Sequence, residues 1–201
     1  LGDVYKRQFQ GCTGLTRAAI GESVTTIKSD AFSGCTALQS IVIPSGVDSI
    51  EMAVFTGCTN LQSVRLEEGA TVIGEYMFLE CTSLSNVELP STLTTIGNGA
   101  FKQCALETVC LPASVDSIGE YAFQNCTALK SVELPAGLKA LSRYVFNGCT
   151  SLGSIVLPDG LETIGYSAFS NCTAMTSITM GDKIKSCLLY TSPSPRDGAT
   201  S

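Results

Sequence analysis

Apolar and polar residues alternate over short stretches that recur about every 23 residues along the chain. In one such stretch Val132 and Leu134 alternate with Ser131 and Glu133, and Pro135 follows. An alternation with a period of two is typical of a β-strand that buries one face, and proline ends a strand because it lacks the N–H that pairing requires. The equivalent inward-facing pairs are Ile41 and Ile43, Val64 and Leu66, Val87 and Leu89, Val109 and Leu111, Ile155 and Leu157, and Ile178 and Met180.

A second apolar pair follows each strand, with its two members three residues apart, as in Val115 and Ile118. We expect this pair to form a shorter strand on the other side of the coil. The next segment, such as residues 120–123, is too short for a full helix and favours one helical or 3₁₀ turn. A glycine or asparagine then precedes the cysteine of most repeats, and these residue types tolerate positive φ. Glu80 and Gln103 depart from this pattern.

A phenylalanine followed three residues later by a cysteine occurs eight times, at intervals of 23 residues except for one interval of 22. The phenylalanines are Phe9, Phe32, Phe55, Phe78, Phe101, Phe123, Phe146 and Phe169. A fixed period of this length predicts a solenoid, because a single coil cannot bury its own apolar side and must stack on its neighbours. We expect a mainly β stack of about seven to eight coils, with a tightened loop between Cys104 and Leu106 where the short repeat lacks one residue.

Five features recur together in most repeats: a leucine, a strand ending in proline, an apolar pair three apart, an alanine–phenylalanine pair and a cysteine. In this combination residues 9–186 resemble the BspA-like class of leucine-rich repeats. Departures are modest, with Val54, Met77 and Val145 in place of the alanine and Met175 in place of the leucine. The resemblance implies a right-handed curved solenoid, usually on bacterial or protist cell surfaces or secreted, that acts in adhesion and protein binding. It implies no catalytic residue.

The two ends of the chain share no pattern with the repeats. Residues 1–8 and 187–194 can be back-translated into inverted copies of one short DNA, which resembles the transposon-end adapter of sequencing libraries. We therefore interpret residues 1–8 and 187–201 as translated adapter, and residues 9–186 as a solenoid fragment without caps. The tails are expected to make no fixed contacts with the solenoid, except that residues 187–190 fall where the eighth coil would continue.

The charge balance, with 12 basic and 18 acidic residues and a net charge of −6, argues against a nucleic-acid partner, which needs clustered lysine and arginine. No apolar run approaches the roughly 20 residues that span a bilayer, so we expect no membrane insertion of this segment. The chain has no histidine, and no serine is paired with a base in the pattern of a nucleophile. We therefore predict a non-enzymatic segment without catalytic residues, cofactor or metal.

The repeat cysteines invite a metal or disulfide interpretation. They are Cys12, Cys35, Cys58, Cys81, Cys104, Cys126, Cys149 and Cys172. Metal sites cluster cysteine and histidine at short spacings that this sequence lacks, and equivalent side chains of stacked coils point inward in parallel rather than at each other. We expect a ladder of reduced, buried thiols that pack as small apolar residues, with some bridges as the alternative. Cys110 occupies an outward strand position, and we expect it to be the most reactive thiol.

Two rows of outward positions run across the predicted strands. One row is nearly all serine or threonine, with Asn86 as the exception. Its neighbour varies in chemistry and consists of Val42, Arg65, Glu88, Cys110, Glu133, Val156 and Thr179. Stacked strands form a broad surface that solenoids use for binding, so the variable row supplies the candidate binding residues. Drifting solvated positions would give the same pattern, and the sequence favours neither interpretation.

Two functional classes remain. The favoured one is a non-catalytic protein-binding or adhesion module of a surface-exposed or secreted protein, with a host or matrix protein as its partner. The alternative is a spacer or substrate-docking arm of a larger extracellular enzyme. Coils without caps expose apolar edges, so end-to-end self-association of the fragment is expected as well.

Overall fold

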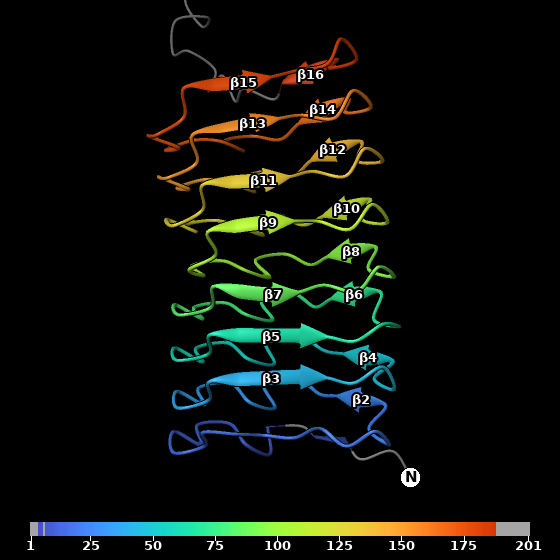
Figure 1. Cartoon of the computed structure of the whole chain (residues 1–201), viewed down its shortest axis with the longest axis vertical. Helices are drawn as coiled ribbons and strands as arrows, with labels where there is room; N and C mark the ends of the chain where they lie inside the picture. The colour runs from blue at the N-terminus through green and yellow to red at the C-terminus, as the bar shows by residue number, and fades with distance from the viewer. Residues whose placement is uncertain (1–3, 6, 188–201) are drawn as a thin grey trace, which may run out of the picture.

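The computed structural model describes residues 4–5 and 7–187, which form one column of stacked coils (Figure 1). The longer strands form one side of the column: β3 (Ser40–Ile43), β5 (Ser63–Leu66), β7 (Asn86–Glu88), β9 (Thr108–Cys110), β11 (Ser131–Glu133), β13 (Ser154–Val156) and β15 (Ser177–Thr179). The two-residue strands form another side: β1 (Val4–Tyr5), β2 (Thr26–Ile27), β4 (Ser49–Ile50), β6 (Val72–Ile73), β8 (Thr95–Ile96), β10 (Ser117–Ile118), β12 (Ala140–Leu141), β14 (Thr163–Ile164) and β16 (Ser186–Cys187). Neighbouring strands are parallel and about 23 residues apart, which confirms the predicted mainly β solenoid, with about seven turns.

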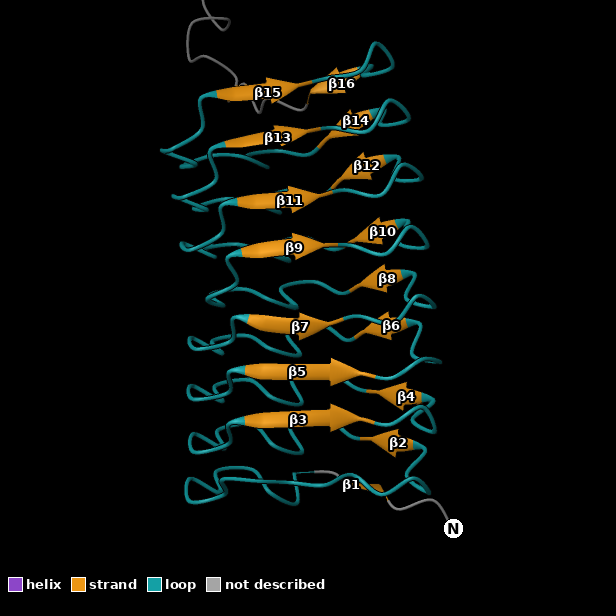
Figure 2. Cartoon of the chain, viewed as in Figure 1, coloured by secondary structure: helices purple, strands orange, loops and turns teal. Residues whose placement is uncertain are grey.

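The segment around each phenylalanine contains no helix in the part of the chain that the structure describes, and Figure 2 shows only strands and loops there. Backbone N–H groups in this segment alternate between two kinds of partner. Cys35 donates within its own coil to the Phe32 carbonyl at 3.1 Å, whereas Phe32 and Gly34 donate to Val54 and Thr56 of the next coil at 2.9 and 2.8 Å. A 3₁₀ helix needs consecutive local bonds. The segment expected to form a helical or 3₁₀ turn is therefore a series of single turns. It does not continue as a helix because every second N–H group donates to a carbonyl of the next coil.

Two residues per coil adopt the left-handed conformation in this segment, with φ between 52° and 75°. The second of them precedes the cysteine, as predicted, and Glu80 and Gln103 adopt the same conformation although they are neither glycine nor asparagine. The first lies four residues earlier and was not predicted: Arg7, Asp30, Ala53, Tyr76, Gly99, Tyr121, Tyr144 and Ser167. A side chain other than glycine costs about 1 kcal/mol or more in this conformation, so the stacking bonds must offset that cost.

The phenylalanine rings form one continuous stack along the column. Neighbouring ring centroids from Phe9 to Phe169 lie 5.1 to 5.7 Å apart, with interplanar angles of 8° to 15°. In the central coils these side chains are fully buried, as Phe55, Phe78 and Phe123 illustrate. Full burial of an aromatic ring of this size is a main source of stability for so narrow a core.

The cysteines run beside this stack, and the predicted burial is confirmed for Cys35, Cys58, Cys81, Cys104, Cys126 and Cys149. The nine cysteines whose side chains the structure describes are free thiols. Each thiol of the repeat cysteines from Cys35 to Cys172, which exclude Cys110, donates to the phenylalanine carbonyl of the preceding coil, at 3.0 to 3.2 Å. The thiols are therefore buried donors as well as small packing residues, because each joins two coils through a carbonyl that also accepts a backbone N–H.

The strand ladders are interrupted, whereas the turns stack without a break. The long strands divide into the sheets β3-β5-β7, β9-β11 and β13-β15, and the short strands into β1-β2-β4, β6-β8-β10 and β12-β14-β16. At the β7–β9 break, inward-facing Val87, Leu89 and Val109 are only half-buried, and Leu134 is half-buried beside the β11–β13 break. Phenylalanine N–H bonds to the next coil cross both of these breaks, as at Phe78 and Phe123. The turns therefore hold the column together where the sheets do not.

The β7–β9 break coincides with the repeat that lacks one residue. In the neighbouring repeats the leucine N–H closes a turn on the cysteine carbonyl, as Leu84 does on Cys81 at 2.9 Å, and no such bond joins Leu106 to Cys104 among the described residues. The loop predicted to be tightened there thus lacks the turn of the neighbouring repeats. A crevice of about 40 Å³ opens beside it and is bordered by Cys110.

Part of the N-terminal tail contacts the solenoid, so the expectation that residues 1–8 make no fixed contacts is wrong. β1 pairs in parallel with β2, and Arg7 forms an ion pair with Asp30 at 3.2 Å. Backbone pairing does not depend on the side chains, so any extended segment can add to an open strand edge. β16 pairs with β14, at the place where the tail was expected to continue the coil. The origin of both tails stays a prediction, and residues 1–3, 6 and 188–201 lie outside the described part.

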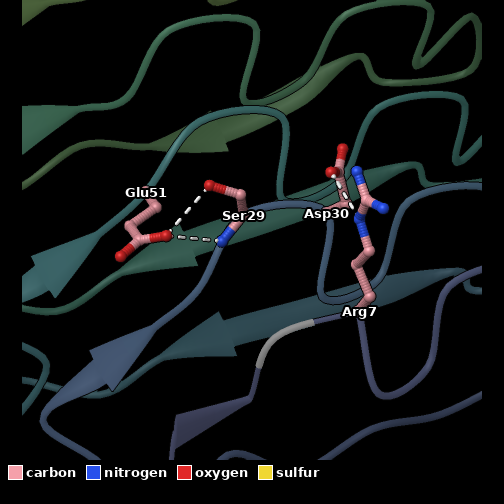
Figure 3. A network of polar contacts seen from close by, with 4 residues as sticks. All are labelled: Arg7, Ser29, Asp30 and Glu51. Atoms are coloured by element: carbon pink, nitrogen blue, oxygen red, sulfur yellow. Dashed lines mark hydrogen bonds and ion pairs between the residues drawn. The ribbon is translucent and has the colours of Figure 1, made fainter.

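A polar network joins the two coils next to the β1–β2 pair (Figure 3). The Glu51 carboxylate accepts the N–H and the hydroxyl of Ser29, both at 2.9 Å, and the Lys28 ammonium at 2.7 Å. The bond from Lys28, followed by the two from Ser29, lowers the pKa of Glu51 from 4.5 to about 2. Glu51 therefore bridges two coils as a carboxylate.

Removing the Cys81 thiol tests the role of the ladder. Cys81→Ala deletes the donor to the Phe55 carbonyl and leaves a small cavity, so it should lower the free energy of unfolding by about 1–2 kcal/mol. Cys81→Ser keeps a donor and should cost less than Cys81→Ala, while Cys12→Ala, at an exposed thiol, should cost almost nothing. Urea unfolding measures all three. An alanine variant as stable as the serine variant would show that the thiol acts by packing alone.

The stability contributed by Glu51 should depend on pH. Because its pKa is lower in the folded than in the unfolded chain, this contribution is complete above pH 4.5 and is lost as the pH falls toward 2. The difference in thermal midpoint between the native chain and Glu51→Gln should accordingly be constant near neutrality and shrink below pH 4.5. Glu22→Gln, at an exposed carboxylate outside the network, is the control. A difference that stays the same down to pH 2 contradicts the assignment.

Candidate functional site

The seven variable residues named above lie on the outer face of the long strands, and all seven are exposed. The strand register aligns Val42 with Arg65, Arg65 with Glu88, and Glu133 with Cys110. Val156 is aligned with Thr179 in the same way. That these residues bind a partner stays a prediction; the structure shows that they lie on the same face and are in register within each of the sheets β3-β5-β7, β9-β11 and β13-β15.

The middle of this row is charged, and a valine lies on each side of the charged part. Arg65 contacts Glu67 at 3.0 Å and Glu88 at 4.0 Å. Of the two valines, Val42 is 46% exposed and Val156 is 67% exposed. The row therefore combines ionic and aliphatic groups, a mixture found at protein contact surfaces.

A groove of about 600 Å³ lies where the ladder breaks between β11 and β13. Besides the strands it is lined by Ala136, Asp159 and Gly160 from the loops that follow them. Sequence reasoning placed the candidate site on the strands alone and missed these loop residues. One signal was present, because Asp159 is the only acidic residue that directly follows a strand-ending proline.

The thiols differ in reactivity according to their surroundings. Burial raises the pKa of Cys58 and of Cys126 to about 12, so the ladder holds few thiolates at neutral pH. Cys110 is exposed, as predicted. Its thiol donates to Glu133 at 3.2 Å, and this bond to a carboxylate raises the pKa of Cys110. That Cys110 is the most reactive thiol stays a prediction, because exposure favours its reaction while Glu133 opposes it.

No other constellation with clear chemistry stands out in the part of the chain that the structure describes. Within residues 4–5 and 7–187, no three or more cysteine, aspartate or glutamate side chains gather as a metal site would require. The same residues include no helix of the length and apolarity that crossing a membrane demands.

Residues 2–130 and 116–191 match the sequence model of the BspA type leucine-rich repeat region, in 6 copies. A leucine-rich repeat protein from Bacteroides ovatus ATCC 8483 is 32% identical over 82% of this chain, with a TM-score of 0.79, and the chain spans only 43% of that protein. A leucine-rich repeat protein of T. pallidum is 29% identical over 68% of this chain and 78% of its own, with a TM-score of 0.52. A third, from Eubacterium ventriosum ATCC 27560, is 21% identical over 88% of this chain and 69% of its own, with a TM-score of 0.57, and shares the fold alone. No curated protein matches the chain.

The Cys110–Glu133 contact predicts a measurable change in thiol chemistry. Glu133→Gln removes the charge that disfavours the thiolate, so alkylation of Cys110 by iodoacetamide at pH 8 should accelerate about three- to tenfold. Glu88→Gln lies in the same row without contacting Cys110 and should leave the rate unchanged. Peptide mapping of the alkylated protein gives the rate for each cysteine. A rate that does not rise in Glu133→Gln would mean that the carboxylate does not control the thiol.

Proposed function

Since the chain belongs to the BspA-type leucine-rich-repeat family, we propose that it is a non-catalytic protein-binding module of a surface-exposed or secreted protein, acting in adhesion. The proposed contact surface is the outer face of the long strands, with Val42, Arg65, Glu88, Cys110, Glu133, Val156 and Thr179 as its variable row. A host or matrix protein is the proposed partner. The family resemblance supports the location at the cell surface.

The observation that carries this proposal is the contrast between the two outward rows. The row from Ser40 to Ser177 consists mostly of short side chains. The longer side chains of the variable row therefore extend further from the strands. These side chains are positioned by strands rather than by loops, which limits the entropy lost when a partner orders them. A row with both ionic and aliphatic groups suits an extended protein contact better than a small-molecule site, which is concave.

A spacer or docking arm of a larger protein is the second candidate. It is favoured by one fact, namely that the chain spans 43% of the Bacteroides ovatus protein. A spacer needs only the rigid column, so changes to the outer face should leave its role intact. The two candidates therefore differ in whether the outer face matters.

Charge reversal on the outer face tests the proposal. The triple variant Arg65→Glu, Glu88→Lys and Glu133→Lys should weaken binding to the best ligand among purified collagen, laminin and fibronectin by at least about tenfold, because misplaced like charges repel. Asp116→Lys changes the net charge by the same amount at an exposed residue next to the short strand β10, and it should have little effect. Surface plasmon resonance measures both. Binding that survives the triple variant overturns the proposed surface, and the absence of binding to all three proteins favours the spacer.

A further inference from the structure

The groove between β11 and β13 runs along both strands. Residues 131–134, Ala136 and residues 154–160 line it. In the coil below, Lys130 N–H donates to the Glu107 carbonyl at 2.8 Å, and no such bond is made by Gly153, the equivalent residue of the next coil, among the described residues. The groove thus lies where two parallel strands have lost their mutual ladder (Figure 1).

An aliphatic side chain stands at the opening of this groove. Val156 of β13 is 67% exposed. The inward-facing residues Val132 of β11 and Ile155 of β13 are 7% and 3% exposed. A single exposed valine is ordinary on a protein surface. Here it borders a hollow of about 600 Å³, so a second aliphatic side chain placed in the groove would bury apolar area on both partners.

Two carboxylates flank the groove, and neither forms an ion pair within the described part of the chain. Some acidic residues elsewhere on the column are paired with cations of neighbouring coils, as Glu107 is with Lys130 and Glu162 with Lys185, each at 2.7 Å. Glu133 accepts only the Cys110 thiol, through Oε2, and Asp159 accepts no described donor. Lys139 approaches the groove at Gly160 but forms no ion pair with Asp159. The groove therefore presents unpaired negative charge beside an aliphatic surface.

We propose that this groove binds an extended peptide segment of the partner protein in which an aliphatic side chain alternates with lysine or arginine. The inference rests on the proposed function and specifies where on the outer face the partner docks. Alternate side chains of an extended peptide point to opposite sides, so with the backbone along the groove the aliphatic set meets Val156 on the β13 side and the cationic set meets Glu133 on the β11 side. A lysine or arginine at the end of the peptide reaches Asp159 in the loop after β13. Recognition of an extended segment beside strands is a common mode of peptide binding.

A defined peptide tests the inference directly. The probe is an acetylated, fluorescein-labelled hexapeptide of alternating valine and lysine, and its binding to the full chain is followed by fluorescence anisotropy. The double variant Glu133→Gln and Asp159→Asn should raise the dissociation constant about tenfold, because two charge-assisted contacts are lost. Val156→Ser should raise it severalfold. The affinity for the native chain should fall as salt screens the carboxylates.

The control pair, Glu22→Gln and Asp116→Asn, removes the same charge outside the groove and should change the dissociation constant by less than about twofold. A hexapeptide of valine and glutamate should bind at least about tenfold more weakly than the probe. Equal losses in both double variants, equal binding of the two peptides, or no binding of the probe would each overturn the inference. Backbone amide NMR shifts at Arg65 and Glu88, instead of at Val156 and Gly160, would overturn it as well while leaving the proposed outer face intact. The proposed function is tested separately by the matrix proteins: the proposed surface is wrong if their binding survives the triple charge reversal, and the spacer is favoured if none of them binds.

Discussion

Each phenylalanine from Phe9 to Phe146 donates its backbone N–H to a carbonyl of the next coil. Its own carbonyl accepts the cysteine N–H of the same coil and the cysteine thiol of the next one, as Phe32 accepts Cys35 and Cys58. Its ring stacks on the phenylalanine rings of the adjacent coils. Buried polar groups must be paired, so a coil that misplaced this turn would lose hydrogen bonds and ring packing together. The left-handed residues on either side of the phenylalanine are the local cost of that arrangement.

Because the turns fix the stacking, the strands are free to vary. Ladder bonds are missing at the β7–β9 and β11–β13 interfaces, yet the phenylalanine column continues past both. Because stability comes from the turns, the strands can carry charged, aliphatic and thiol side chains in one outward row without loss of the fold. This arrangement also allows a groove to form between two coils. The missing strand pairing destabilises the column little, because the phenylalanine turns still hold the coils together. The candidate contact surface is therefore a consequence of where the stability lies.

The repeating part of the fold could be predicted from sequence. The alternation of Val132 with Ser131 and Glu133, and the fixed interval between phenylalanines, encode burial directly, because each inward position recurs with the same chemistry. The outward placement of Arg65 and Glu88 followed from the same alternation. A contact such as Cys110 with Glu133 was open to prediction as well, since residues 23 apart become neighbours once the coils stack.

What depends on coil-to-coil geometry could not be predicted in this way. The positive φ of Ala53 and Tyr76 arises from hydrogen bonds between coils, and neither residue type signals it. The groove beside Val156 lies where β11 and β13 do not pair, and no residue pattern specifies such a break. The pairing of β1 with β2 uses backbone alone, so the unrelated sequence of the tail gave no warning of it.

Amide hydrogen exchange tests most directly the claim that the turns, rather than the sheets, hold the column together. Around the β11–β13 break, Phe123 and Phe146 donate their N–H groups to the next coil at 2.9 Å, whereas Gly153 makes no equivalent bond to the coil below. If the claim is right, the Phe123 and Phe146 amides exchange only through global unfolding, and the Gly153 amide exchanges orders of magnitude faster. Exchange of the two phenylalanine amides at the rate of Gly153, with the strand amides as the slowest group, would contradict it.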